Sequence, residues 1–164
     1  MSYEKTVWAG EGTLAREQEY NDHWCYERGI ITKAWLDVYA ATGDRRFYDA
    51  AKANVDQYVT ADGEILTYEP DKYNLDMICM GRTAPRLFKA TGEAKYEKAC
   101  RRLIEQIKGQ PTTAEGGFWH KKLYPQQMWL DGIYMACPFL TEFAVIFGEM
   151  QWADLAAKQM TLIF

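Results

Sequence analysis

The sequence is poor in several residue types that mark particular classes of protein. Five prolines among 164 residues are too few for a proline-rich or collagen-like chain. Two histidines and four cysteines, with no CxxC pair, do not predict a structural zinc site. Lysine and arginine number 19 against 23 aspartates and glutamates, so no basic surface for a nucleic acid partner is expected.

Long apolar runs are also missing. No run approaches the roughly 20 residues of a membrane helix, so no membrane association is expected. The first five residues do not resemble a secretory signal, and we expect a cytoplasmic protein. The cysteines fall inside apolar helical patterns, which favours buried free thiols over disulfides. A hydrophobic content of 48%, with 15% aromatic residues, predicts a single domain over residues 1–164 with a substantial core.

Three segments share a helix–turn–helix pattern that pivots on a glycine. They span residues 30–58, 78–107 and 134–163, and the pivots are Gly43, Gly92 and Gly148. Glycine at such a position suits the left-handed end of a helix. An aromatic residue stands four positions after each glycine, and small or apolar residues follow seven, eight and twelve positions after it. These offsets place one apolar face on the second helix of each hairpin.

Repeated helical hairpins stack into solenoids or close into α/α toroids. A toroid of six hairpins, at about 50 residues each, needs about 300 residues, so this chain supplies about half of one. The predicted fold is therefore all-α, a partial (α/α)6 barrel of about three hairpins. Residues 1–22 precede the first hairpin and are expected to be irregular.

One acidic residue precedes each pivot glycine by 16 or 17 positions; these residues are Glu27, Asp76 and Asp131. Equivalent positions of stacked hairpins fall at the same end of the ring, so the three carboxylates should share one rim. Acids at helix starts are most often capping or dipole residues, and this structural role is the competing interpretation. Carboxylates that flank a bound sugar, with aromatic rings beside them, also suit glycoside cleavage.

A long loop rich in glycine and proline is predicted over residues 110–127. Long loops inside compact domains tend to be functional. His120 lies in this loop, eleven residues before Asp131, and we expect it to join the carboxylates. The neighbouring Lys121 could meet a substrate carboxylate as a point charge, while a solvated lysine is the simpler interpretation.

These segments resemble the unsaturated rhamnogalacturonyl hydrolases, glycoside hydrolase family 105, which are related to the unsaturated glucuronyl hydrolases. The resemblance runs over residues 23–164, with a looser match at Trp24-Cys25-Tyr26. Its most specific parts are GGFWHK at 116–121, YPQQMWLDGIYM at 124–135, and YNLD at 73–76 with GR at 81–82. The chain departs from the family where Met77 and Cys79 replace two usual asparagines.

The resemblance implies that this chain is the N-terminal half of a six-hairpin barrel. It implies an enzyme that releases a 4,5-unsaturated uronic acid from the non-reducing end of pectin-derived rhamnogalacturonan oligosaccharides. In this family an aspartate is thought to protonate C4 of the ring double bond while water adds at C5. The resulting hemiketal opens and releases the neighbouring sugar. No metal and no organic cofactor are implied.

The resemblance also assigns roles to residues. Asp131 would be the catalytic proton donor that also activates the water, and Asp76 would assist it. The substrate-binding residues would be His120, Tyr26, Trp129 and Lys121. Burial beside Trp129 and repulsion from Asp76 would help Asp131 to hold a proton near neutral pH. The expected partner is an oligosaccharide, and a homo-oligomer would cover the exposed faces of a half barrel.

Two other functions remain open. An unsaturated glucuronyl hydrolase acting on glycosaminoglycan fragments would use the same chemistry, and rates on a substrate panel would separate the two. A helical-repeat interaction module with an inactive site belongs to a different class. Such a module would not prefer an unsaturated over a saturated disaccharide. The presence of Asp76, His120 and Asp131 argues against it.

Overall fold

A computed structural model describes residues 3–16 and 22–163 of the chain. Over these residues the chain is helical, with isolated bridges between extended residues at Val59–Ile65 and Thr112–Phe118. In the first hairpin, α2 (Tyr26–Thr42) is followed by α3 (Arg45–Asp56). In the second, the first arm consists of two short helices, α4 (Leu75–Gly81) and α5 (Ala84–Thr91), and the second arm is α6 (Ala94–Gly109). In the third, α7 (Leu130–Phe147) is followed by α8 (Gln151–Ile163). A 3-10 turn, Pro70–Lys72, precedes α4. The all-α fold built of helical hairpins is confirmed.

The hairpins turn at the predicted glycines. Gly43, Gly92 and Gly148 have φ angles of 71°, 70° and 72°, in the left-handed region that glycine adopts without a steric penalty. Each glycine N–H donates to the carbonyl oxygen four residues earlier, which closes the last helical turn. The aromatic residues four positions later, Phe47, Tyr96 and Trp152, are buried. The local pattern therefore sets both the turn and the face of the second helix that packs inward.

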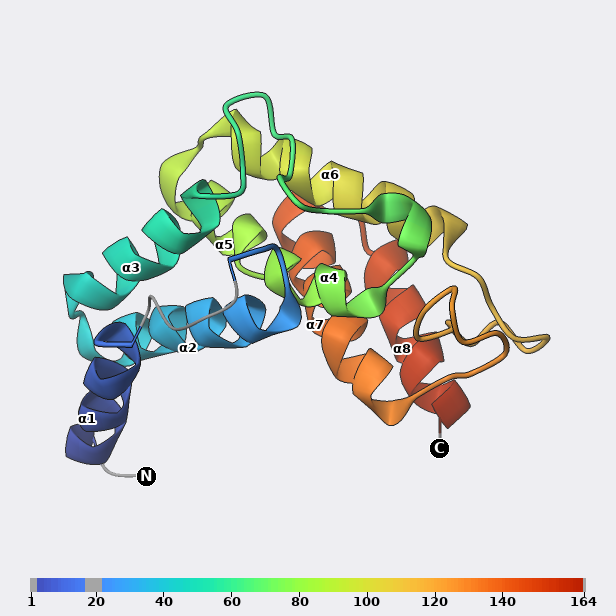
Figure 1. The fold of residues 1–164 in the computed structure, drawn as a ribbon, viewed down its shortest axis with the longest axis horizontal. Coiled ribbons are helices and arrows are strands. Elements are labelled where there is room, and N and C mark those ends of the chain that lie inside the picture. The colour runs from blue at the N-terminus through green and yellow to red at the C-terminus, as the bar shows by residue number, and fades with distance from the viewer. Residues whose placement is uncertain (1–2, 17–21, 164) are drawn as a thin grey trace.

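The first helices of the hairpins lie side by side. Figure 1 shows α4 and α5 between α2 and α7, and each second helix packs on the first helix of its own hairpin. Gly29 of α2 lies so close to α4 that a Cβ there would stand 2.6 Å from the Met80 backbone. The hydroxyls of Thr32 and Thr83 are 2.9 Å apart in the same interface. These small residues let the inner helices approach closely enough to bring their starts together.

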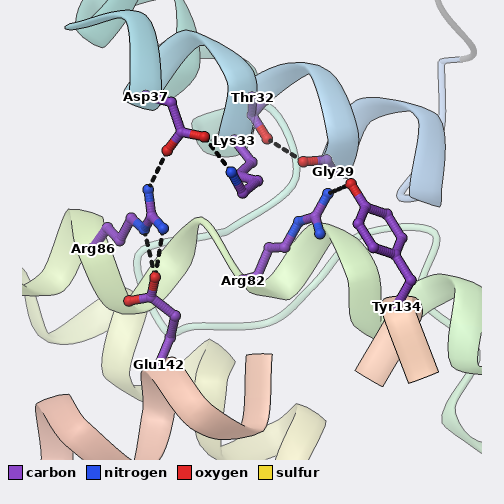
Figure 2. Close-up of polar contacts among 8 residues, drawn as sticks. All are labelled: Gly29, Thr32, Lys33, Asp37, Arg82, Arg86, Tyr134 and Glu142. Carbon is purple, nitrogen blue, oxygen red and sulfur yellow. Dashed lines mark hydrogen bonds and ion pairs between the residues drawn. The ribbon is translucent and has the colours of Figure 1, made fainter. Parts of the chain in front are cut away.

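An ion cluster also ties the inner helices to one another (Figure 2). Arg86 of α5 donates to Asp37 of α2 at 2.8 Å and to Glu142 of α7 at 2.8 and 2.5 Å. Lys33 contacts the same Asp37 carboxylate. Because one guanidinium bridges two other helices, the cluster fixes the positions of all three relative to one another.

The N-terminal segment differs from the expectation. Residues 1–22 were predicted to be irregular, but they contain the helix α1 (Tyr3–Leu14); residues 1–2 and 17–21 lie outside the described part. Tertiary contacts explain the difference. Gly10 leaves room for the ring of Phe47, and Thr13 accepts a 2.8 Å hydrogen bond from the indole of Trp35. Docking on α2 and α3 stabilises a helix that the sequence pattern does not reveal.

The helix α7 is long and apolar enough to cross a membrane by length and composition alone, contrary to the expectation from sequence. Core helices of soluble proteins meet the same criterion. One side of α7 packs on α4 and another on α8, with Phe139, Leu140 and Phe143 fully buried. Its composition therefore fits a place within a helical core.

The four cysteines are buried and unpaired, as predicted. Burial raises the pKa of the thiols of Cys25, Cys79 and Cys137 to about 11. Because the thiolate is the reactive form, these side chains act as small apolar core residues.

Candidate active site

The three predicted acidic residues lie at the starts of the inner helices. The first turn of α2 contains Glu27, that of α4 contains Asp76, and that of α7 contains Asp131. Asn74 is the residue that caps α4, because its side-chain oxygen accepts from the Asp76 N–H at 3.0 Å. The carboxylate of Asp76 is thus not used as a cap, although it lies in the first turn of α4, where the helix dipole favours an acid.

Asp76 is held by two donors from the long loop. His120 Nε2 lies 3.1 Å from Asp76 Oδ1, and Lys121 Nζ lies 2.5 Å from Oδ2. Burial alone would raise the pKa of this carboxyl, but the hydrogen bonds from His120 and Lys121 outweigh it and lower the pKa. Asp76 is consequently an ionised carboxylate. Lys121 is engaged in this pair, which disfavours the simpler interpretation of a solvated lysine.

The loop over residues 110–129 brings His120 to the rim. Its backbone N–H donates to Gln127 at 2.8 Å, and its carbonyl accepts from the Leu75 N–H at 3.1 Å. The imidazole is buried and stacks on the indole of Trp129, with ring centroids 4.4 Å apart and planes 9° apart. Tyr124 stacks on the same indole at 5.1 Å. The loop is therefore a folded support that fixes the orientation of the imidazole.

Asp131 faces outward beside this pair. Its Oδ2 lies 3.9 Å from His120 Nε2, and its side chain is 55% exposed against 15% for Asp76. The expectation that Asp131 is buried beside Trp129 is therefore wrong, because more than half of its side chain is exposed. The structure thus gives the two carboxylates different surroundings. Asp76 is partly buried and paired with two donors, whereas Asp131 is exposed and lies near the imidazole.

The remaining predicted residues surround the carboxylates. Trp129 is 38% exposed and Tyr26 is 37% exposed, so both present ring surface to a ligand. Tyr26 and Asp76 line the same cavity of about 130 Å³. The negative charge of Glu27 raises the pKa of the Tyr26 hydroxyl, which therefore stays protonated as a hydrogen-bond donor. All six predicted site residues lie at this one rim.

Asp76, His120 and Asp131 are also residue types that bind divalent cations. Ligand atoms of Asp76, His120 and Asp131 lie within 4.8 Å of one another. Lys121 and the His120 Nε2–H already occupy both oxygens of Asp76, however. The donor set is therefore arranged as a hydrogen-bonded group more than as a cation cage.

Sequence reasoning assigned no role to a pair of residues that joins the end of α4 to the start of α7. Arg82 is buried and donates to the Tyr134 hydroxyl at 2.9 Å, with its guanidinium 4.6 Å from the ring centroid (Figure 2). Its Nε and Nη1 have no hydrogen-bond partner within the described ranges. Tyr134 follows Asp131 by three residues, so helical spacing could have placed it on the same face.

A large hollow begins next to Asp131, at Leu130. It is an apolar groove of about 810 Å³ along α7, which shares Leu130 and Tyr134 with the neighbourhood of Asp131.

Two inequivalent carboxylates beside an imidazole and stacked rings, on consecutive helical hairpins, suit a glycoside hydrolase. The chain belongs to Glycosyl Hydrolase Family 88, whose profile matches residues 5–163. Its structure is also similar to that of a family 105 glycoside hydrolase from C. acetobutylicum ATCC 824. That protein is 35% identical, with a TM-score of 0.88 over 99% of this chain. The resemblance to family 105 is thereby confirmed.

Two further solved structures share the fold. A Klebsiella pneumoniae protein, a possible member of family 105, is 23% identical with a TM-score of 0.75. A Salmonella enterica protein of the same description is 20% identical with a TM-score of 0.71. Each match covers 85% of this chain.

The chain spans only part of these relatives. It covers 44% of the C. acetobutylicum chain and 36% of each of the other two. The described hairpins therefore correspond to a part of an (α/α)6 barrel.

Proposed function

We propose that this chain carries the catalytic rim of an unsaturated rhamnogalacturonyl hydrolase. The reaction releases a 4,5-unsaturated uronic acid from the non-reducing end of a pectin-derived oligosaccharide by hydration of the C4–C5 double bond. The observation that carries the proposal is the unequal environment of two neighbouring carboxylates. Asp76 is partly buried and bonded to His120 and Lys121, whereas Asp131 is open to a ligand.

This difference assigns the two carboxylates to different roles. Asp76 is held as an anion by two donors, so it does not carry a proton to the substrate. Asp131 has no such pair of donors among the described residues, and its carboxyl is exposed where a substrate can reach it. A general acid must lie within hydrogen-bond reach of the atom it protonates. Asp131 is therefore the proton donor, and Asp76 holds His120 in place.

The proposed reaction balances without a cofactor. The Asp131 carboxyl gives its proton to C4, and the ring oxygen stabilises the cation that forms at C5. Water adds at C5 and returns a proton to the Asp131 carboxylate. The resulting hemiketal opens, and the bond to the neighbouring sugar then breaks. Trp129 and Tyr26 offer ring surface to the sugar, Lys121 offers its remaining N–H groups to the sugar carboxylate, and His120 helps to orient Asp76.

The experiment follows the loss of ultraviolet absorbance as the double bond of an unsaturated rhamnogalacturonan disaccharide is hydrated. An unsaturated glucuronyl disaccharide is the second substrate. A saturated disaccharide serves as the third ligand in a binding measurement. We expect turnover of the first substrate and preferential binding of unsaturated sugars.

Asp131→Asn should abolish turnover while leaving the fold intact. The matched control is Asp154→Asn, which removes an exposed acid from the first turn of α8, away from the rim. Faster hydrolysis of the glucuronyl substrate would identify the protein as an unsaturated glucuronyl hydrolase, which uses the same chemistry. Equal binding of saturated and unsaturated sugars, without turnover, would contradict the proposal and favour an interaction module.

A further inference from the structure

We propose that Gln110, at the end of α6, is a positioning residue that sets the geometry between Asp76 and His120. Gln110 is 5% exposed. Its Nε2 donates to two backbone carbonyls, that of Tyr73 at 2.9 Å and that of Trp119 at 2.8 Å. Tyr73 leads into the helix that carries Asp76, and Trp119 immediately precedes His120. One amide group thus links the two chain segments that carry Asp76 and His120.

Both segments need such support, because neither has regular secondary structure at these carbonyls. Tyr73 has a left-handed backbone with φ of 44°, a conformation disfavoured for a residue with a bulky side chain. Trp119 lies in the long loop. The Leu75 N–H donates to the His120 carbonyl at 3.1 Å, and this backbone bond joins the same two segments. The bonds of Gln110 therefore fix the separation of the two chain segments next to the site.

The amide of Gln110 is itself oriented by a second buried glutamine one helical turn earlier. Gln106 Nε2 donates to Gln110 Oε1 at 3.2 Å and to the Asn74 carbonyl at 3.2 Å. The Tyr68 hydroxyl donates to Gln106 Oε1 at 2.7 Å. These bonds leave the Nε2 of Gln110 facing the two carbonyls. The complete network is satisfied, and a satisfied buried network specifies one arrangement.

Loss of the Gln110 hydrogen bonds should therefore displace the His120 imidazole more than it lowers the overall stability. His120 keeps a 3.1 Å bond to Asp76 only while the loop and the start of α4 hold their separation. Gln110 does not touch the rim and acts through the backbone of its neighbours. Small displacements of a positioned group reduce catalysis strongly, by as much as about 100-fold for 1 Å.

The test uses Gln110→Met, which keeps the approximate size of the side chain and removes both donors. The matched control is Gln159→Met. Gln159 is 1% exposed, accepts from the Phe118 N–H at 2.7 Å, and donates to the Gly116 carbonyl at 3.0 Å. It therefore holds the same loop from α8, and its side-chain hydrogen bonds among the described residues go to that loop alone. Circular dichroism and urea unfolding establish that both variants are folded.

The primary readout is the nitrogen-15 and proton spectrum of the His120 imidazole in the full chain. The chain has one other histidine, the exposed His23, which His23→Gln removes from the spectrum. We expect the hydrogen-bonded Nε2–H signal of His120 to be lost or displaced in Gln110→Met and kept in Gln159→Met. Gln106→Met should give a smaller displacement, and it provides the test if Gln110→Met does not fold.

An unchanged His120 spectrum in folded Gln110→Met would overturn the inference. The same displacement in Gln159→Met would also overturn it, because the effect would then reflect loop stability in general. The kinetic readout rests on the proposed function, and there we expect kcat to fall about 10- to 100-fold with a much smaller change in KM. A chain without turnover would count against the proposed function alone, since the spectrum decides the inference independently.

Discussion

Gly132 of α7 lies directly against the imidazole of His120. A Cβ atom at Gly132 would stand 3.1 Å from His120 Nδ1. This nitrogen is buried and has no hydrogen-bond partner among the residues that the structure describes. The ring is consequently confined between the first turn of α7 and Asp76, with its other nitrogen directed at the carboxylates.

Gly132→Ala should therefore damage the site more than the fold. The new methyl group would push the imidazole away from α7 and would also lie 3.2 Å from Leu75. Overpacking costs about 1–3 kcal/mol, while alanine in a helix gains up to about 1 kcal/mol over glycine. We expect a modest loss of unfolding free energy in urea, together with about a tenfold loss of turnover on the unsaturated disaccharide.

Gly12→Ala is the control for this substitution. Gly12 lies within α1, and its Cβ position has no atom within 4 Å. The variant should be as stable as the original chain or more stable, with turnover unchanged. Equal turnover in Gly132→Ala and Gly12→Ala would mean that the imidazole tolerates displacement.

The lowered pKa of Asp76 predicts a pH-dependent contribution to stability. Its folded-state pKa lies below the ordinary value of 3.8, so the stabilisation is complete above 3.8. It is lost as the pH falls through the lower folded-state value, where the carboxyl takes up a proton in both states. Asp76→Asn should therefore reduce the unfolding free energy by about 1–3 kcal/mol near neutral pH, and by progressively less in stronger acid.

Urea unfolding of both proteins, near neutral pH and well below 3.8, measures this difference. Asp71→Asn is the matched control, because Asp71 is exposed and makes no ion pair among the described residues. Its substitution should have little effect at either pH. A constant difference between Asp76→Asn and the original chain at all pH values would show that His120 and Lys121 do not stabilise the carboxylate.

Local features of the sequence were sufficient to predict the hairpins and the rim. Left-handed glycine caps and helical offsets depend on residues close together in the chain, so the positions of Asp76 and Asp131 followed from spacing. The role of Gln110 could not be predicted in this way, because its two acceptor carbonyls come from different segments. The exposure of Asp131 and the helical state of α1 also depend on tertiary packing, which no local pattern reports.

The remaining prediction concerns the apolar face of α7. Leu130 and Val145 are 62% and 66% exposed, and they line the groove that also includes Met160 of α8. Contiguous exposed apolar surface of this kind favours association. We expect the chain to form a homo-oligomer that buries this face, with a sedimentation coefficient that increases with protein concentration.

Val145→Glu should weaken this association, because the interface would have to bury an unpaired charge. Leu66→Glu is the control, since it places the same charge on a 49% exposed leucine away from α7. Sedimentation velocity over a range of concentrations should show a smaller species for Val145→Glu and no change for Leu66→Glu. A single monomeric species of the original chain at every concentration would contradict the prediction, and the face of α7 would then tolerate exposure to water in this protein.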